Sequence, residues 1–586
     1  MSGEEDFESA NRHGLLLYDF ALSPCARRCR ITMIEKGLRW DIQTIDLSRL
    51  EQRNPAYLEI NPNGFVPTLA HGERVIYESN VITEYLDDIF PETPLYPSDP
   101  WELAQVKMWQ SAEAAMAKDY RALMYQRVMG PMLRLTRSLE EALAAVRRST
   151  SDPADLAWEE RVWRLAVLTP AEETEYQDRL LRWLDTLEKR LEERDFLVGD
   201  RFSQAEISLF PRVAMYPYIG LRIDPRRYPN VSRWMGRLQG RPSFARTDSP
   251  QSRGLERLSR TPLLPWLART LRKAEVERTR REALGLAVLK RAARRFLGGG
   301  DAAPDAAPPP ARGIRPPRTG EIAPRDSPSR LFASAVAKKL DPQITLYDYP
   351  HSPHGRRIRI LLSEKVLRWE TVQVEMDRMA HKRPDYLAIN PNGELPALRD
   401  GDRLIHDSQL IAEYLDASYE GTKLYPRDAY QVAQVRMWLA LEAGTHKEFR
   451  PLFYLHIVRP ASLAAGITAE SVDRLVPPGV HPSHLAWLRD VLRGEVRFDT
   501  SELLAREIIL GKLEVIERRL AVSAYLVGDS FGMADLGWFT RIETFPALGL
   551  EVEGQRFPGV VRWLEAIRRR PAVEANPCAP APVIHP

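Results

Sequence analysis

Two serine–proline pairs each lie between an expected strand and an expected helix. Ser23 lies in residues 17–31, LYDFALSPCARRCRI, and Ser352 lies in residues 346–360, LYDYPHSPHGRRIRI, with nine of fifteen positions identical. Proline fits the first helical position and serine can cap it, so both pairs predict a helix start. A hydroxyl at this positive end of a helix can donate a hydrogen bond to an anion.

An acidic residue followed by serine opens another expected helix in each half. Glu78 and Ser79 begin ESNVITEYL, and Asp407 and Ser408 begin DSQLIAEYL. A carboxylate can pair with an ammonium group, while a hydroxyl beside free helix amides can hold a carboxylate. Each pair therefore has the chemistry to bind a group carrying both charges. The alternative is a helix cap with an acidic neighbour.

These motifs belong to one long internal repeat. Residues 55–69, PAYLEINPNGFVPTL, align with residues 384–398, PDYLAINPNGELPAL, with ten of fifteen identities and the same offset of 329 positions that relates the serine pairs. No net insertion is needed over more than 200 residues. A period this long is not that of a solenoid, so it predicts a duplicated pair of domains.

Each copy predicts a small mixed sheet with helices, followed by a helical domain. In the first copy the order is β-α-β-α-β-β-α, starting from the buried run LLLYDF. After Tyr96 the apolar residues recur at helical spacing, and Ser203 with Glu206 forms a capping box. We expect α/β domains at 15–97 and 343–426, all-helical domains at 98–250 and 427–575, and a linker at 251–342.

The linker has a composition of its own. Residues 269–295 contain ten basic and three acidic residues, and a Pro-rich stretch that reads as a flexible tether follows. The basic stretch predicts one or two helices lying on a neighbouring domain. Peripheral contact with an anionic membrane surface, or with an acidic partner, is the less favoured alternative.

Composition argues against several other classes of protein. The 83 basic and 80 acidic residues leave a net charge of only +3, so nucleic acid is not an expected partner. Three cysteines, without a Cys/His cluster of ligand spacing, predict neither a disulfide framework nor a metal site. The acidic, polar start and the lack of long apolar runs predict a cytoplasmic protein.

Taken together, the motifs resemble those of cytosolic glutathione transferases of the serine type, the theta and zeta classes, over residues 15–245 and 344–575. The resemblance implies a thioredoxin-like domain followed by an all-α domain, twice. It implies that Ser23 and Ser352 donate to the thiolate of bound glutathione, with simple helix capping as the alternative. Cys25 would form a mixed disulfide with glutathione, line its pocket, or only pack.

The resemblance assigns further residues to the glutathione site. The prolines of Val66-Pro67 and Leu395-Pro396 should follow cis bonds, which turn the preceding backbone towards the cysteinyl part of glutathione. Glu78 with Ser79, and Asp407 with Ser408, would hold its γ-glutamyl end. Before the proline pairs this chain has Phe65 and Glu394, where many relatives place Lys or Gln near the glycine carboxylate. Glu394 would repel that carboxylate unless His381 or Lys382 lies closer, so the first site is expected to be the better one.

The electrophilic acceptor would lie between the two domains of each copy. Aromatic and basic residues at matching positions predict an apolar pocket that contains a cation. They are Tyr120, Arg121 and Tyr125 in the first copy and Phe449, Arg450 and Tyr454 in the second. Core packing is the alternative for the aromatic residues.

The expected function is an enzyme that activates glutathione for attack on an apolar electrophile, by conjugation, isomerisation, dehalogenation or ether cleavage. The alternative is a non-catalytic binding or scaffold protein with transferase-like domains. Relatives form two-fold dimers, so the two copies are expected to pair within the chain or the chain to form a homodimer.

Overall fold

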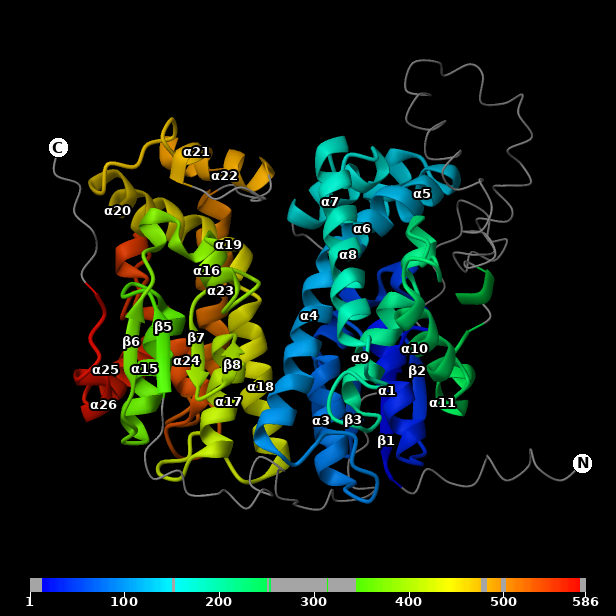
Figure 1. The fold of residues 1–586 in the computed structure, drawn as a ribbon, viewed down its shortest axis with the longest axis horizontal. Coiled ribbons are helices and arrows are strands. Elements are labelled where there is room, and N and C mark those ends of the chain that lie inside the picture. The colour runs from blue at the N-terminus through cyan, green and yellow to red at the C-terminus, as the bar shows by residue number, and fades with distance from the viewer. Residues whose placement is uncertain are drawn as a thin grey trace, which may run out of the picture. The chain divides into compact units, whose positions relative to one another are not determined.

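The computed structural model describes residues 13–149, 153–249, 252–254, 314, 344–475, 482–496 and 502–579. Contacts divide the chain into two compact units, residues 1–96 with 109–325 and residues 97–108 with 326–586 (Figure 1). The predicted basic helices and the Pro-rich tether lie outside the described residues. No helix among those described is both long and apolar enough to cross a membrane.

A four-stranded mixed sheet lies in the first unit. It consists of β1 (Leu15–Asp19), β2 (Asp41–Thr44), β3 (Thr68–His71) and β4 (Arg74–Tyr77), in the order β2-β1-β3-β4. Strand β1 pairs parallel with β2 and antiparallel with β3, which pairs antiparallel with β4. Every residue of β1 is buried, as its apolar sequence predicts.

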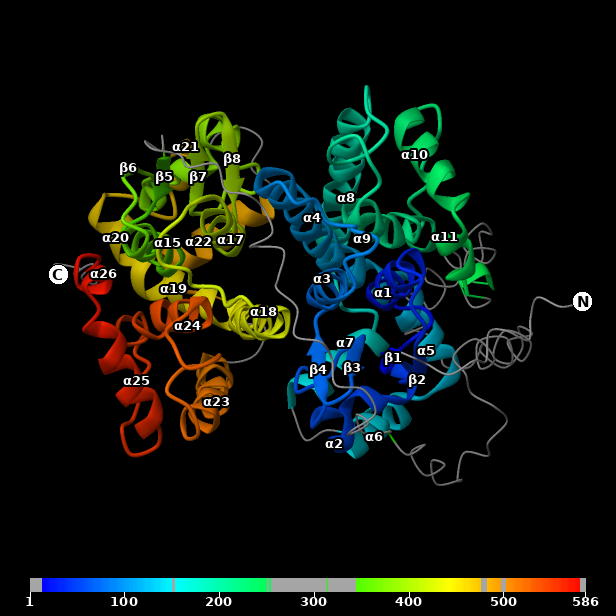
Figure 2. The ribbon, with the colours of Figure 1, turned by 90° about the horizontal axis from the view of Figure 1, so that it is seen from below.

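Helices cover this sheet and bring its functional loops together. They are α1 (Pro24–Glu35), α2 (Pro55–Leu58) and α3 (Ser79–Ile89), with short 3₁₀ turns at Leu47–Arg49 and Glu51–Arg53. Helix α1 packs on α3 and also on α9 and α11 of the helical domain (Figure 2). Because α1 begins at the first serine motif and α3 at the second, this packing brings the two motifs close together.

The helical domain of the first copy follows directly, and the division by contacts assigns residues 97–108, which include the start of its first helix, to the second unit. Its elements are α4 (Pro100–Met124), a π-helical turn (Tyr125–Met129), α5 (Gly130–Thr136), α6 (Leu139–Ser149), α7 (Pro153–Trp163), α8 (Pro170–Arg190), α9 (Gln204–Val213), a 3₁₀ turn (Tyr216–Ile219), α10 (Pro229–Gln239) and α11 (Pro242–Arg246). Helix α9 is buried along its whole length. The predicted capping box starts it: Glu206 accepts from the Ser203 amide at 2.9 Å and from the Leu197 amide at 2.6 Å.

The second unit repeats this order of elements. Its sheet, ordered β6-β5-β7-β8, and its first helices are β5 (Ile344–Asp348), α15 (Pro353–Glu364), β6 (Glu370–Gln373), 3₁₀ turns at Met376–Arg378 and Ala380–Lys382, α16 (Pro384–Leu387), β7 (Ala397–Asp400), β8 (Arg403–His406) and α17 (Ser408–Ser418). Its helical domain contains α18 (Ala429–Ala443), α19 (His446–Phe453), a π-helical turn (Tyr454–Val458), α20 (Arg459–Ala464), α21 (Val472–Leu475), α22 (Pro482–Arg493), α23 (Glu502–Leu520), α24 (Met533–Ile542), a 3₁₀ turn (Pro546–Leu548), α25 (Pro558–Arg568) and α26 (Pro571–Glu574). The predicted fold class, a thioredoxin-like domain followed by an all-α domain and present twice, is confirmed.

One difference between the units lies in the long helix after the sheet domain. Helix α4 runs unbroken for 25 residues, whereas its counterpart ends at Ala443 and restarts at His446. Gly444 stands at the break, where the first unit has Ala115, and the Thr445 hydroxyl donates to the Glu442 carbonyl at 2.7 Å. Glycine favours a helix end, and the threonine hydroxyl occupies a carbonyl that the helix ladder uses.

Candidate functional site

The two Ser-Pro serines are the N-caps of α1 and α15. Ser23 Oγ accepts from the Ala26 amide at 3.2 Å, and Ser352 Oγ accepts from the Gly355 amide at 3.1 Å. A hydroxyl carries one donor and two acceptor sites, so capping uses an acceptor site and leaves the proton for a ligand. The capping role and the predicted role towards a thiolate are therefore compatible at the same atom.

Both predicted cis bonds are present, at Val66-Pro67 and Leu395-Pro396. The loop in front of each is held by two side chains that donate to one carbonyl. The donors are Tyr57 (2.6 Å) and Asn61 (2.9 Å) to Phe65 O, and Tyr386 (2.6 Å) and Asn390 (2.7 Å) to Glu394 O. These two hydrogen bonds hold the carbonyl of the residue just before Val66 and just before Leu395, and so help to fix the backbone at both positions.

The acidic residues of the acid–serine pairs have an unusual backbone. Glu78 has φ of 70° and Asp407 has φ of 76°, and helices α3 and α17 begin at the serines that follow. A non-glycine residue in this region costs about 1 to 3 kcal/mol and persists only where the surroundings impose it, typically at functional sites. The sequence pattern located both residues but did not indicate this conformation.

The two acids differ in their electrostatic surroundings. Asn63 Nδ2 donates to Glu78 Oε1 at 3.3 Å. Burial raises the pKa of Glu78, and Asn63, Arg121 and Arg28 oppose that rise. Burial also raises the pKa of Asp407, where its hydrogen bond from the Gln409 amide opposes the rise and the neighbouring Glu394 adds to it. Arg357 opposes the rise at Asp407 as Arg28 does at Glu78, so the two surroundings differ mainly in Glu394, which stands where the first unit has the neutral Phe65.

A buried cluster of arginine, glutamate and arginine lies beneath each acid–serine pair. In the first unit Arg28 donates to Ser79 Oγ at 3.0 Å and forms an ion pair with Glu113, which also binds Arg212 at 2.8 Å. Burial alone would raise the pKa of Glu113, but the two arginines hold that pKa below its usual value.

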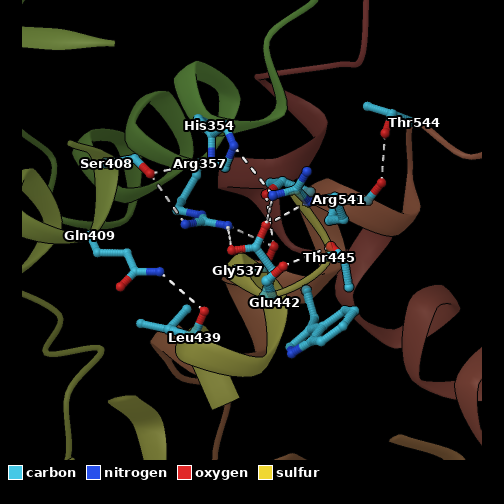
Figure 3. A network of polar contacts seen from close by, with 12 residues as sticks. His354, Arg357, Ser408, Gln409, Leu439, Glu442, Thr445, Gly537, Arg541 and Thr544 are labelled. Atoms are coloured by element: carbon cyan, nitrogen blue, oxygen red, sulfur yellow. Dashed lines mark hydrogen bonds and ion pairs between the residues drawn. The ribbon is translucent and has the colours of Figure 1, made fainter. Parts of the chain in front are cut away.

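The second unit has the same cluster at an offset of 329, shown in Figure 3. Arg357 lies 3.3 Å from Ser408 Oγ and 3.1 Å from Glu442, and Arg541 forms an ion pair with Glu442. The two arginines hold the pKa of Glu442 well below its usual range against the effect of burial. Sequence reasoning missed all six residues, although charged residues that repeat on apolar, buried helices were a usable signal.

The cysteines occupy different positions around the first site. Cys25 is partly buried at the start of α1, and its charge would interact with Arg28 and Arg212. Cys29 is buried, and its Sγ lies 3.7 Å from the Ser79 carbonyl. Burial raises the pKa of the Cys29 thiol, so that thiol is an inert part of the core. The role of Cys25 as a residue that lines the glutathione pocket stays a prediction.

The predicted acceptor residues of the first unit divide into two groups. Tyr120 is buried, stacks on Tyr216 at 6.4 Å and donates to the Met215 carbonyl at 3.3 Å, so it serves as a core residue. Arg121 is exposed, with its guanidinium 5.9 Å from the ring centroid of Phe65 in the loop before the cis bond. The prediction of an acceptor pocket therefore rests on Arg121 and Tyr125.

In the second unit the matching residues are arranged around a tryptophan. Arg450 lies 5.5 Å from the ring of Tyr454 and 4.8 Å from that of Trp487, and the two rings meet edge to face at 4.7 Å. Phe449 is buried under Arg541 at 4.1 Å. Trp158, which contacts Tyr125 at 5.2 Å, is the counterpart of Trp487. These two tryptophans were missed, although their offset of 329 marks them.

A cation does lie close to Glu394. Lys382 is partly buried, and its Nζ donates to the Gly393 carbonyl at 2.8 Å. Burial lowers the pKa of Lys382 to about 8; Glu394 opposes that change and Arg450 adds to it. The other candidate, His381, is buried. The second site thus holds an acid and a base whose charges offset each other near neutral pH.

The fold and the site motifs have counterparts in known proteins. Two family models described as "Glutathione S-transferase, N-terminal domain" match residues 22–89 and 346–423, one each, and the model "Glutathione S-transferase, C-terminal domain" matches residues 163–242 and 484–571. Both kinds of domain are therefore found twice in this chain, in the same order.

Individual relatives match part of the chain, up to about the length of one unit. Glutathione S-transferase 3 of Zea mays is 34% identical over 251 residues, 41% of this chain and 97% of the maize protein. Protein LigF of Sphingobium sp. strain SYK-6 is 40% identical over 97 residues, 16% of this chain and 41% of LigF. The crystal structure of β-etherase LigF matches with a TM-score of 0.37 and 26% identity, over 40% of this chain and 98% of that structure.

Proposed function

The chain belongs to the glutathione S-transferase family, and from this premise we propose that its first unit binds glutathione between the starts of α1 and α3 and activates the thiol with Ser23. Val66 would pair through its backbone with the cysteinyl part of the ligand, and Glu78 with Ser79 would hold the γ-glutamyl end. The supporting observation is the geometry of Ser23, whose capping hydrogen bond leaves the hydroxyl proton for the sulfur.

The physical task of the site is to lower a thiol pKa. A free thiol with a pKa near ~8.5 is only a few per cent ionised at pH 7, and lowering this pKa by two units requires about 2.7 kcal/mol of preferential stabilisation of the thiolate. One hydrogen bond to a charged atom contributes about 1.5 to 3 kcal/mol, and a helix terminus adds about 0.3 to 1 kcal/mol. The Ser23 hydroxyl and the α1 amides together would contribute about 1.8 to 4 kcal/mol, a range that includes the required stabilisation.

The charges around Ser79 suit the γ-glutamyl end of glutathione. Its α-amino group would pair with Glu78, and its α-carboxylate would accept from the Ser79 hydroxyl and the first amides of α3. The buried Arg28 beneath Ser79 adds a cation on the side that the carboxylate would approach. Two oppositely charged subsites in this order orient the tripeptide with its sulfur towards Ser23.

The electrophile would be an apolar compound held near Arg121 and Tyr125. Conjugation, isomerisation, dehalogenation and ether cleavage share the same first step, attack by the thiolate, and differ in what the acceptor releases. The similarity to LigF, a protein described as a β-etherase, supports ether cleavage as one member of this set. The acceptor class follows from the pocket chemistry: an aromatic or other apolar electrophile without a strong positive charge.

The second unit is proposed to bind glutathione more weakly at Ser352, Leu395, Asp407 and Ser408. Glu394 adds a second carboxylate near Asp407, and like charges disfavour an anionic ligand there. This observation also favours the alternative for the second unit, a transferase-like binding module without turnover.

The two units are proposed to pair with each other within one chain, as the family resemblance implies, since a tether raises the effective concentration to roughly millimolar. Sedimentation equilibrium measures this directly. A single-chain mass at all concentrations excludes the homodimer and is the mass expected for pairing within the chain. A mass of two chains that persists on dilution supports a homodimer instead.

Ser23→Ala tests the proposed mechanism. Turnover of a chlorinated nitroarene with glutathione should fall about 10- to 1000-fold, as for the loss of a single donor to a developing anion. The circular dichroism spectrum should not change. Ser203→Ala, which removes the capping hydroxyl of α9 instead of that of α1, is the control for loss of a capping hydroxyl. An unchanged rate in the double variant Ser23→Ala, Ser352→Ala would refute activation by serine.

A further inference from the structure

The position two residues after the capping serine differs in chemistry between the units. The first unit has Cys25 there and the second has His354. Both side chains are partly buried and face the arginine cluster of their own unit. In Figure 3 His354 lies between Ser408 and Arg541, so it links the acid–serine pair to the buried cluster.

The hydrogen bonds of His354 determine its tautomer. Nε2 lies 3.3 Å from Arg541 Nη2, and Nδ1 lies 3.4 Å from Ser408 Oγ. A guanidinium nitrogen can only donate, so Nε2 must accept and the ring proton must be on Nδ1. Burial and the neighbouring Arg541 also lower the pKa of His354 well below its usual value, which keeps the ring neutral.

This tautomer determines where the Ser408 hydroxyl can point. His354 Nδ1–H donates to Ser408 Oγ, and Arg357 Nη1 donates to the same oxygen at 3.3 Å. Both acceptor sites of the hydroxyl are then occupied, so its proton must point away from both donors. In the part of the first unit that the structure describes, Ser79 Oγ has one such donor, Arg28. The Ser79 hydroxyl therefore keeps a rotational freedom that the Ser408 hydroxyl lacks.

We propose that His354 is a positioning residue of the second glutathione site, which holds the Ser408 hydroxyl as a directed donor to the α-carboxylate of the γ-glutamyl group. This inference rests on the function proposed above for the second unit. The role is specific to the second unit, because the first unit has Cys25 at the position of His354.

The test is calorimetric titration of the full chain in a background where Glu78→Ala and Ser79→Ala disable the first site. The ligands are glutathione and its analogue without the α-carboxylate, 4-aminobutyryl-cysteinyl-glycine. His354→Phe should weaken glutathione binding about tenfold, as for the loss of a well-directed hydrogen bond to a charged group. The same substitution should change the binding of the analogue less than twofold.

A double-mutant cycle tests whether His354 acts through Ser408. With Ser408→Ala present, His354→Phe should have no further effect on glutathione binding, because the hydroxyl it directs is gone. His354→Asn, which keeps a donor near the position of Nδ1, should restore most of the affinity. A nitrogen-15 spectrum, in which the His354 signals are identified by their loss in His354→Phe, should show that this imidazole is neutral and protonated at Nδ1.

Three results would overturn the inference. Equal losses for glutathione and for the analogue would make His354 only structural. Additive losses in the cycle, or an imidazole protonated at Nε2, would remove its link to Ser408. If the background protein binds no glutathione at all, the proposed function of the second unit fails first and the inference fails with it.

Discussion

The charge state of Lys382 should make the second glutathione site sensitive to pH. Its Nζ lies at the Gly393 carbonyl, one residue before Glu394, and burial lowers its pKa to about 8. The lysine is therefore protonated below pH 8 and loses its charge as the pH rises through 8. While it is charged it offsets Glu394, so the glycine carboxylate of glutathione should bind best below pH 8 and worst above it.

The size of the effect follows from that pKa. With a pKa of about 8, about nine-tenths of the free protein carries the charge at pH 7 and about one-tenth at pH 9. If only the charged form binds the carboxylate well, the dissociation constant should rise about tenfold between these pH values, or about 1.4 kcal/mol. Two opposite unit charges ~4 Å apart attract each other by ~4 kcal/mol at an effective dielectric near ~20, before screening by salt. The loss of one lysine charge is therefore large enough to account for the expected change.

Calorimetry with S-methylglutathione measures this change without a titrating thiol, again with the first site disabled by Glu78→Ala and Ser79→Ala. Lys382→Arg is the matched control because Arg53 occupies this position in the first unit and a guanidinium stays charged throughout. The step near pH 8 should disappear in that variant, leaving only the titration of the ligand's own amine. An identical step in Lys382→Arg, or none in the unsubstituted chain, would refute the assigned role.

Two further predictions concern stability. Glu442→Leu should destabilise the second unit by about 3 to 5 kcal/mol because it leaves two arginines buried without their carboxylate, and thermal unfolding should show this as an earlier transition; an unchanged transition would mean that the arginines find other partners. Gly355→Ala would place a methyl group 1.6 Å from Asp348 Oδ1 and should lower the free energy of unfolding by about 1 to 3 kcal/mol. Gly511→Ala lies inside α23, where no atom is within 4 Å of the new group, and should raise the free energy of unfolding by about 0.5 to 1 kcal/mol. Equal melting temperatures for the two alanine variants would contradict the packing described for Gly355.

Local features of the site were predictable from short stretches of sequence. The Ser-Pro helix starts, the capping box at Ser203 and the strand and helix order depend on contacts between residues a few positions apart, which residue type largely determines. The two cis bonds came from the family resemblance, since residue type alone permits but does not require them. The repeat itself was visible because two copies of each motif share one offset.

The electrostatic character of each site, in contrast, depends on residues far apart in the chain. Arg28 and Glu113 are 85 positions apart, and Glu113 and Arg212 are 99 apart, so only the packing of α1, α4 and α9 brings them together. The positive φ of Glu78 is imposed by the surrounding loops, and the burial of Tyr120 follows from its stacking on Tyr216. The sequence alone determined which elements form and which hydroxyls cap them, because those preferences are local; the tertiary structure decided which charges face those hydroxyls, because Coulomb and packing interactions depend on distance in space.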